Sequence, residues 1–139
     1  MTRAAPRTRQ GFQNLRKASW ACLNSCAVYT AKQKACDVCG EPLQYFASKA
    51  EFKRWRWLLL AQRAGVISKL QVQPSYPIEV AGMLVCTYRA DFAYMDHDKK
   101  CLVVEDVKGS SDAKHLDPVF VLKRKLFEAV YQMPITITQ

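Results

Sequence analysis

Two aspartates and a lysine in the second half of the chain have the types and spacing of a hydrolytic metal site. Asp106 and Lys108 are two residues apart, and side chains two apart on a β-strand share a face. If Asp91 joins them, the two carboxylates repel each other unless a cation lies between them, and oxygen ligands suit Mg²⁺ or Mn²⁺. Lys108 could then position an attacking water or stabilise charge developing on a phosphate. The alternative is a salt bridge on an exposed strand face, which requires no metal.

The register of a hairpin decides whether Asp91 belongs to this set. Residues 84–94 and 101–108 show the patterning of strands, and the polar residues between them have the length of a hairpin turn. A hairpin centred just after Asp98 pairs Asp91 with Asp106. Directly opposed residues lie on one face of a sheet, so we expect these two carboxylates to lie together.

Two glutamates complete the set of candidate acidic residues. Glu105 is next to Asp106 and therefore points to the opposite face, where we expect it to be structural or to support the site indirectly. Glu51 stands three residues after Ser48, which is the spacing of a capping box at a helix start. Its carboxylate could instead project toward the sheet and become a further metal ligand. Both interpretations of Glu51 stay open.

The elements that position these residues follow in the order helix, three strands, helix, strand. Apolar spacing and a capping box predict the first helix, and an Asp-Pro pair marks the start of the second. We place the elements as a helix over 48–65, strands over 66–72 (resumed over 76–80 as an edge strand), 84–94 and 101–108, a helix from Asp117 to Met133, and a strand over 135–138.

The faces of the two helices follow from the same spacing. We expect Trp55 in the core and leave Trp57 open between core and nucleic-acid contact. On the second helix we expect the basic side chains Lys123, Arg124 and Lys125 on the exposed side. The apolar positions through which this helix runs are Val119, Leu122, Leu126 and Val130.

Four of the six cysteines lie between residues 20 and 45 with the spacing of zinc ligands. Cys36 and Cys39 flank a tight turn followed by glycine, which is the form of a zinc knuckle. Cys22 and Cys26 could complete a tetrahedral four-thiolate site. Such a closed shell leaves no position for substrate, so this zinc would be structural. Free thiols in a small loop-rich segment are the alternative.

Composition indicates the class of protein and of partner. The 139 residues suit one compact domain with a small appendage, and 21 basic against 12 acidic residues give a net charge of +9. This balance favours a polyanion such as DNA over a membrane, since no basic amphipathic helix, lipidation signal or long apolar run is evident. Without a secretory signal we expect a cytoplasmic protein with reduced thiols. Cys86 and Cys101, which lie outside the cluster, are expected to be small core residues.

Residues 1–19 have the composition of a basic arm. Basic side chains occur there without any acidic one, together with proline and glycine. The arm could contact phosphates, or it could be a solubilising tail. Its basic residues are Arg3, Arg7, Arg9, Arg16 and Lys17.

These motifs resemble a family of small phage proteins that is often described only as a domain of unknown function. That family is regarded as endonuclease-like and similar to phage Holliday-junction resolvases of the PD-(D/E)XK superfamily. The most specific part is the block Glu-Asp-Val-Lys-Gly at 105–109 after Tyr-Arg-Ala-Asp-Phe at 88–92. The resemblance covers residues 46–139, and it includes 48–51, 73–74, 117–118 and Lys123.

The resemblance implies a role for each candidate residue. Asp91 corresponds to the aspartate of the first half of the motif, although Ala90 replaces the preceding proline. Asp106 and Lys108 correspond to the acidic residue and the lysine of the second half. Glu51 corresponds to the acidic residue on the first helix of the superfamily. The implied metal is Mg²⁺ or Mn²⁺, held by Asp91 and Asp106 with Glu51 assisting.

The resemblance also implies a fold and an activity. The fold would be α+β, with the αβββαβ restriction-endonuclease-like core over 46–139 and a mixed sheet flanked by helices. The zinc segment over 20–45, which the cysteine spacing predicts, would precede this core. The activity would be hydrolysis of DNA phosphodiesters, selective for branched or junction structure, because the basic groups would contact backbone rather than bases. Junction resolvers generally act as dimers, which is compatible with a homodimer here. A phage-encoded protein of this kind would act in the host cytoplasm.

Two other functions are compatible with the sequence. The chain could be a non-catalytic DNA-binding module in which the zinc segment binds and the rest is scaffold. It could also be a protein-interaction factor whose charge is incidental, and steep salt dependence of DNA binding would argue against that interpretation.

Overall fold

The chain falls into two units, Met1–Lys53 and Arg54–Gln139. The computed structural model describes residues 20–108 and 116–139. The predicted basic arm, with Arg3, Arg7, Arg9, Arg16 and Lys17, lies outside the described residues.

The first unit contains a small antiparallel sheet in the cysteine-rich segment. Strands β1 (Trp20–Ala21), β2 (Val28–Tyr29) and β3 (Gln44–Tyr45) are each two residues long, in the order β2-β1-β3. A sheet this small buries little apolar surface, so its loops need additional cross-links. The cysteines described below lie in those loops.

Helix α2 (Lys49–Arg63) begins and ends as predicted. The Ser48 hydroxyl accepts the backbone N–H of Glu51 at 3.1 Å, which is one half of a capping box. At the other end Gly65 has a φ of +79°, a left-handed conformation that favours glycine. The amide of Val66 then bonds to the carbonyl of Ala61 at 3.0 Å and closes the helix end.

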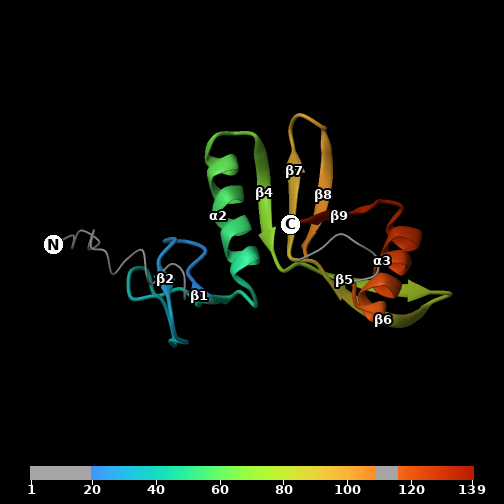
Figure 1. Cartoon of the computed structure of the whole chain (residues 1–139), viewed down its shortest axis with the longest axis horizontal. Coiled ribbons are helices and arrows are strands. Elements are labelled where there is room, and N and C mark those ends of the chain that lie inside the picture. The colour runs from blue at the N-terminus through green and yellow to red at the C-terminus, as the bar shows by residue number, and fades with distance from the viewer. Residues whose placement is uncertain (1–19, 109–115) are drawn as a thin grey trace. The chain divides into compact units, whose positions relative to one another are not determined.

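A four-stranded mixed sheet forms the centre of the second unit (Figure 1). Its strands β4, β7, β8 and β9 are neighbours in that order. The first two pairings are antiparallel and the last is parallel. The parallel pair is joined by helix α3, as a parallel connection requires. The strands span Ile67–Val72 (β4), Phe92–Asp96 (β7), Cys101–Val107 (β8) and Ile135–Thr138 (β9).

The predicted strand over 84–94 is wrong, because the structure divides it between two sheets. Strand β6 (Met83–Arg89) pairs with β5 (Ser75–Val80) in a separate two-stranded hairpin, and only β7 joins the main sheet. Residues 76–80 therefore belong to β5 and pair with β6, and they do not continue the first strand as an edge of the main sheet. The chain changes sheets at Ala90 and Asp91, where the amide of Ala90 bonds to Pro74 O and that of Asp91 to Glu105 O.

The register of the β7–β8 hairpin is the predicted one. Phe92 pairs with Glu105 and Asp96 pairs with Cys101. Asp91 lies one position beyond the last pair of the ladder, although its N–H still bonds to the carbonyl of Glu105 at 3.1 Å. Asp91 is therefore next to Asp106 as expected, but in the segment that joins the two sheets rather than within a strand.

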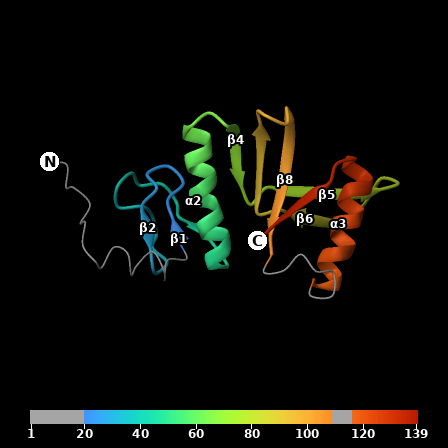
Figure 2. The same cartoon turned by 45° about the horizontal axis from the view of Figure 1, so that its top comes forward.

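Helix α3 (Pro118–Tyr131) begins at the predicted Asp117 cap, whose carboxylate accepts the N–H of Val119 at 3.0 Å. The predicted distribution of its faces is wrong for most of the apolar positions, although Leu126 packs against the core and Lys125 is exposed as expected. The buried residues of the helix are Phe120 and Phe127. The helix packs beside the β5–β6 hairpin (Figure 2), and much of the side that was expected to be buried is exposed to solvent. The two aromatic rings fill the core, so the smaller aliphatic residues Val119, Leu122 and Val130 are exposed.

Helices α2 and α3 contact opposite faces of the main sheet. Ala93 and Val104 share the core with Phe127 of α3, whereas Tyr94 and Glu105 bond to each other on the α2 side. Alternation along β7 and β8 produces this division. Among the described residues, no helix is long and apolar enough to cross a membrane.

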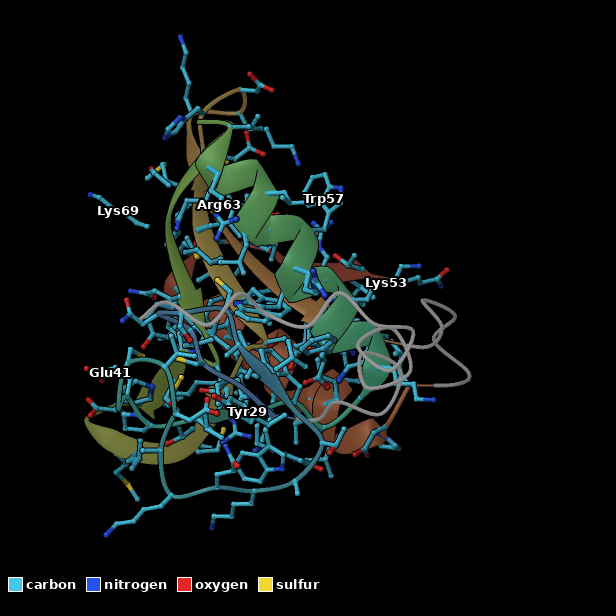
Figure 3. All side chains as sticks on the ribbon, turned by 90° about the vertical axis from the view of Figure 1, so that its left-hand side faces the viewer. Tyr29, Glu41, Lys53, Trp57, Arg63 and Lys69 are labelled. Carbon is cyan, nitrogen blue, oxygen red and sulfur yellow. The ribbon has the colours of Figure 1, made fainter. Side chains whose placement is uncertain are left out.

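Burial decides the remaining side-chain predictions. Trp55 is buried as expected, whereas Trp57 is half-exposed and projects from α2 on the side away from β4 (Figure 3). Cys86 packs partly buried against the core. The prediction for Cys101 is wrong, because it begins β8 at the hairpin turn, where its side chain is exposed.

Candidate functional site

Asp106 is the centre of a cluster of charged and polar groups on the α3 face of the main sheet. Its Oδ2 accepts a hydrogen bond from the Tyr88 hydroxyl at 2.6 Å, and its Oδ1 lies 2.7 Å from the Nζ of Lys108. Asp91 joins the cluster from the start of β7, where its Oδ2 accepts the backbone N–H of Val107 at 2.7 Å. The structure therefore brings three of the predicted residues, Asp91, Asp106 and Lys108, to one end of the hairpin.

The burial of Asp106 makes this arrangement unusual. The residue is 3% exposed, and a buried carboxylate normally requires both charge compensation and hydrogen bonds. Lys108 supplies the charge, but Oδ1 has no hydrogen-bond partner, alone among the buried side-chain oxygens and nitrogens of the described residues. A buried carboxylate oxygen with a cation nearby and no hydrogen bond is a suitable ligand for a hard divalent ion.

The carboxylates of Asp106 and Asp91 both lie close enough to the Tyr88 hydroxyl to influence its pKa. Burial raises the pKa of Tyr88 far above its usual value, and the hydrogen bond and negative charge of Asp106 raise it further, followed by the charge of Asp91. Tyr88 is therefore a neutral donor at any physiological pH. Sequence reasoning missed this residue, although it lies three positions before Asp91 within the matching block.

Lys108 is fixed by a backbone hydrogen bond to β9 and by a side-chain contact with α3. Its N–H bonds to the carbonyl of Thr138 on β9 at 2.8 Å, and its Nζ lies 4.1 Å from the centre of the Phe120 ring. A cation over an aromatic face is attracted to the ring, and the contact also restricts the lysine rotamer. The side chain is still 32% exposed, so its amine can reach solvent or a ligand as well as Asp106.

Glu105 is fully buried on the opposite face and has all its partners within the protein. Arg54 of α2 binds it with two hydrogen bonds, Nε to Oε1 at 2.6 Å and Nη2 to Oε2 at 2.8 Å. Tyr94 donates to Oε2 at 2.8 Å, and burial, together with the charge of Glu105, raises the pKa of Tyr94 to about 12. The ion pair between Arg54 and Glu105 links α2 to β8, in agreement with the structural role expected for Glu105.

Glu51 lies in the first turn of α2, within the first unit. Its backbone N–H is capped by Ser48, so the capping interpretation accounts for its position in the helix. Its assignment as a metal ligand stays a prediction.

Three of the four clustered cysteines form a group that can hold a metal ion. The sulfur atoms of Cys22, Cys36 and Cys39 all lie within 4.8 Å of one another, and those of Cys22 and Cys39 are 3.4 Å apart. In a tetrahedral zinc site with Zn–S bonds of about 2.3 Å, the sulfur atoms are separated by roughly 3.8 Å. The three thiols are therefore close to the required spacing.

Hydrogen bonds around Cys36 favour its thiolate. Burial opposes the charged form, but the Ser25 hydroxyl at 3.1 Å, the Tyr29 hydroxyl at 3.3 Å and backbone N–H groups outweigh it. Together they lower the pKa of Cys36 to about 6. A thiolate is the form that binds metal, and N–H and O–H groups directed at sulfur are the usual outer partners of such a site. Neither Ser25 nor Tyr29 was expected from cysteine spacing.

Cys26, the fourth predicted ligand, is not in this group of sulfur atoms. Its backbone has a φ of 60°, and its N–H bonds to the carbonyl of Cys22 at 2.9 Å, which closes a tight turn. The turn accounts for the Cys22–Cys26 spacing in the sequence without requiring both sulfur atoms to point the same way.

The predicted DNA-contacting residues of α3 differ in exposure. Lys125 is exposed, but Lys123 and Arg124 are half-buried. The Nζ of Lys123 donates to the carbonyl of Thr87 on β6 at 3.3 Å, and Arg124 forms an ion pair with Glu128 at 3.1 Å. Lys125 is therefore the most accessible of the three to an external phosphate.

The chain belongs to the family described as "Protein of unknown function (DUF1064)", which it matches over residues 28–138. No curated protein and no solved structure matches it. The family match includes Asp91, Asp106 and Lys108, together with Cys36 and Cys39, but begins after Cys22.

Proposed function

We propose that this protein is a metal-dependent DNA endonuclease whose active site contains Asp91, Asp106 and Lys108. The observation that carries the proposal is the state of Asp106. Its Oδ1 is buried without a hydrogen bond beside the Nζ of Lys108, next to a second carboxylate. In the Arg54–Glu105 pair both carboxylate oxygens accept aligned hydrogen bonds, whereas Oδ1 of Asp106 has only the ion-pair contact with the Nζ of Lys108 at 2.7 Å.

The carboxylates of Asp91 and Asp106 would hold Mg²⁺ or Mn²⁺, which oxygen ligands favour. Such an ion supplies Lewis-acid stabilisation of phosphate charge and lowers the pKa of water. Lys108 would orient the attacking water or stabilise negative charge on the scissile phosphate through its ammonium group. Its partial exposure allows this second contact, since the amine is not enclosed by Asp106 and Phe120.

The fold supports the same proposal. If the β5–β6 hairpin is regarded as an insertion, the second unit and α2 follow the order helix, three strands, helix, strand. The third and fourth strands of this series are parallel neighbours in a mixed sheet. This order fits the restriction-endonuclease-like core implied by the resemblance of residues 46–139, with Asp106 on the third strand and Lys108 directly after its end.

DNA is the proposed substrate because of charge. The net charge of +9 favours a polyanion, and each neutralised phosphate releases counterions. Lys125 on α3 and Arg89 at the end of β6, two residues before Asp91, are both exposed. Side chains of this kind grip the backbone rather than read bases, which suits selection of a branched or junction structure.

We also propose that the cysteine group binds a structural zinc ion. Cys22, Cys36 and Cys39 would provide three thiolates, and Cys26 remains the predicted fourth. A thiolate set is typical of zinc, whereas the carboxylate site suits a harder ion, so the two metals would occupy separate sites.

Cleavage of a DNA panel tests the endonuclease directly. Purified protein is incubated with Mg²⁺ and a four-way junction, a nicked duplex, a single strand and a plain duplex. We expect cleavage by the wild type and a loss of at least about 100-fold in Lys108→Ala, the scale reported for one stabilising group. Lys99→Ala, an exposed lysine in the β7–β8 turn, is the matched control and should cleave normally. Equal cleavage by the wild type and Lys108→Ala would refute the assignment.

Asp106→Asn separates the endonuclease from a non-catalytic DNA-binding module. The endonuclease predicts that cleavage is lost while DNA affinity, measured with Ca²⁺, persists or increases because a negative charge has been removed. The binding module predicts no cleavage by either protein and unchanged behaviour on DNA.

A further inference from the structure

Tyr88 connects the separate β5–β6 hairpin to the acidic residue of the main sheet. It lies near the end of β6, is 2% exposed, and packs its ring against Phe127 of α3 with centroids 5.4 Å apart. From this position its hydroxyl donates to Asp106 Oδ2 at 2.6 Å, within the range of short hydrogen bonds to a charged acceptor. The phenol therefore has one fixed direction, set by the core around its ring.

This hydrogen bond makes the two oxygens of Asp106 different. Oδ2 accepts the hydrogen bond of the buried Tyr88 hydroxyl at 2.6 Å, whereas Oδ1 has only the partly exposed amine of Lys108 beside it, at 2.7 Å. With Oδ2 fixed, the carboxylate cannot rotate freely about its Cβ–Cγ bond. Oδ1 is thus held in one place, ready to accept a cation.

We propose that Tyr88 is a positioning residue that fixes the Asp106 carboxylate so that Oδ1 is its metal-binding oxygen. The inference rests on the proposed function, because it assumes that Asp106 binds the catalytic ion. Partners that orient a metal ligand commonly affect metal affinity nearly as much as the ligand itself. Tyr88 has a second connection to the site, since only Arg89 and Ala90 separate it from Asp91.

The neighbouring Tyr94–Glu105 pair shows what a purely structural phenol–carboxylate contact looks like. Tyr94 donates to Glu105 at 2.8 Å, but Arg54 bonds to both oxygens of that carboxylate. The two carboxylates, Glu105 and Asp106, lie at adjacent positions of β8 and therefore on opposite faces of the main sheet. One pair is closed by a guanidinium group, and the other leaves an oxygen without a hydrogen bond.

The comparison of Tyr88→Phe with Tyr94→Phe tests the proposal. Each substitution removes one buried hydroxyl while keeping the ring, so both proteins should fold with similar losses of thermal stability; near-UV circular dichroism checks the fold. Mn²⁺ affinity is measured from the electron paramagnetic resonance signal of the free ion. We expect Tyr88→Phe to weaken Mn²⁺ binding by about 10- to 100-fold. Tyr94→Phe should bind Mn²⁺ like the wild type.

Activity provides a second readout. Tyr88→Phe should need about 10- to 100-fold more Mg²⁺ for half-maximal cleavage and recover much of its rate at saturating Mg²⁺, because its metal ligands and Lys108 are intact. A loss caused only by instability would not be rescued by metal in this way. Equal Mn²⁺ affinity in Tyr88→Phe and Tyr94→Phe would overturn the role of Tyr88.

Asp106→Asn separates failure of this inference from failure of the proposed function. If the wild type binds Mn²⁺ and Asp106→Asn does not, the metal site stands, and the two tyrosine variants then decide the role of Tyr88. If Asp106→Asn binds Mn²⁺ like the wild type, Asp106 is not a ligand, and both proposals are refuted.

Discussion

Glu105 and Asp106 are adjacent acidic residues on opposite faces of the sheet, and their side chains have different partners. The amide variant of Glu105 should therefore lose stability and keep activity, whereas that of Asp106 should keep stability and lose activity. Glu105→Gln replaces a fully buried carboxylate that receives three hydrogen bonds, two from Arg54 and one from Tyr94. The amide keeps one acceptor oxygen and turns an N–H₂ group toward the guanidinium. Arg54 then keeps its charge with only 23% of its side chain exposed to water.

The expected cost of Glu105→Gln is large. Breaking a buried ion pair by removing one partner costs about 3–5 kcal/mol. Arg54 retains some solvent, so we take the lower end, about 3 kcal/mol. For a domain the size of the second unit, about 1 kcal/mol shifts the melting temperature by roughly 4–8 °C, so the expected decrease is about 12–24 °C.

Asp106→Asn should change stability by no more than about 1 kcal/mol. Its amide oxygen can still accept from Tyr88, and removal of the charge ends the desolvation of a buried carboxylate. Lys108 loses its ion pair, but its side chain is 32% exposed and can be solvated. Cleavage should nevertheless be abolished, because the proposed metal ligand is lost.

Urea unfolding followed by tryptophan fluorescence measures both variants under the same metal conditions. Folded Glu105→Gln should retain cleavage in proportion to its folded fraction, whereas Asp106→Asn should be stable and inactive. If Asp106→Asn is destabilised as much as Glu105→Gln, the assignment of one face to scaffold and the other to chemistry is wrong. The same conclusion follows if Glu105→Gln loses less than about 1 kcal/mol.

Other predictions test the cysteine group, the helix end and the surface. Cys36→Ser should lower the zinc content measured by native mass spectrometry, while Cys101→Ser should not. In the folded protein Cys101, which is exposed, should react with a thiol reagent faster than the half-buried Cys86. Gly65→Ala should cost about 1 kcal/mol in urea unfolding, because a β-carbon is strained at a φ of +79°. Lys125→Ala should weaken DNA binding and reduce the slope of log affinity against log salt by about 1; an unchanged slope would remove Lys125 from the interface.

Features that depend on neighbouring residues could be predicted from the sequence. The Ser48 cap and Gly65 bound α2, and the polar turn after Asp96 determined the register of β7 and β8. These features follow from short-range hydrogen bonds and from strand alternation, which operate within a few residues. Strand alternation likewise predicted that Asp106 and Lys108 lie on the same face of the sheet.

Features that depend on long-range packing could not be predicted in this way. Residues 84–94 have the pattern of one strand, but the partners of β6 and β7 lie in different sheets, and alternation does not identify a partner. The apolar spacing of α3 fits more than one face, and the rings of Phe120 and Phe127 occupy the core that smaller residues were expected to fill.

The sequence by itself determined that Asp91, Asp106 and Lys108 lie together and that four cysteines are candidates for a metal site. Only the tertiary structure decided the surroundings that give these residues their chemistry. It brought Tyr88 from a separate hairpin to one oxygen of Asp106 and buried the other oxygen without a hydrogen bond. It also grouped three of the cysteines rather than four. The physical reason is that burial and hydrogen-bond partners are set by contacts between distant segments, whereas spacing is set within one segment.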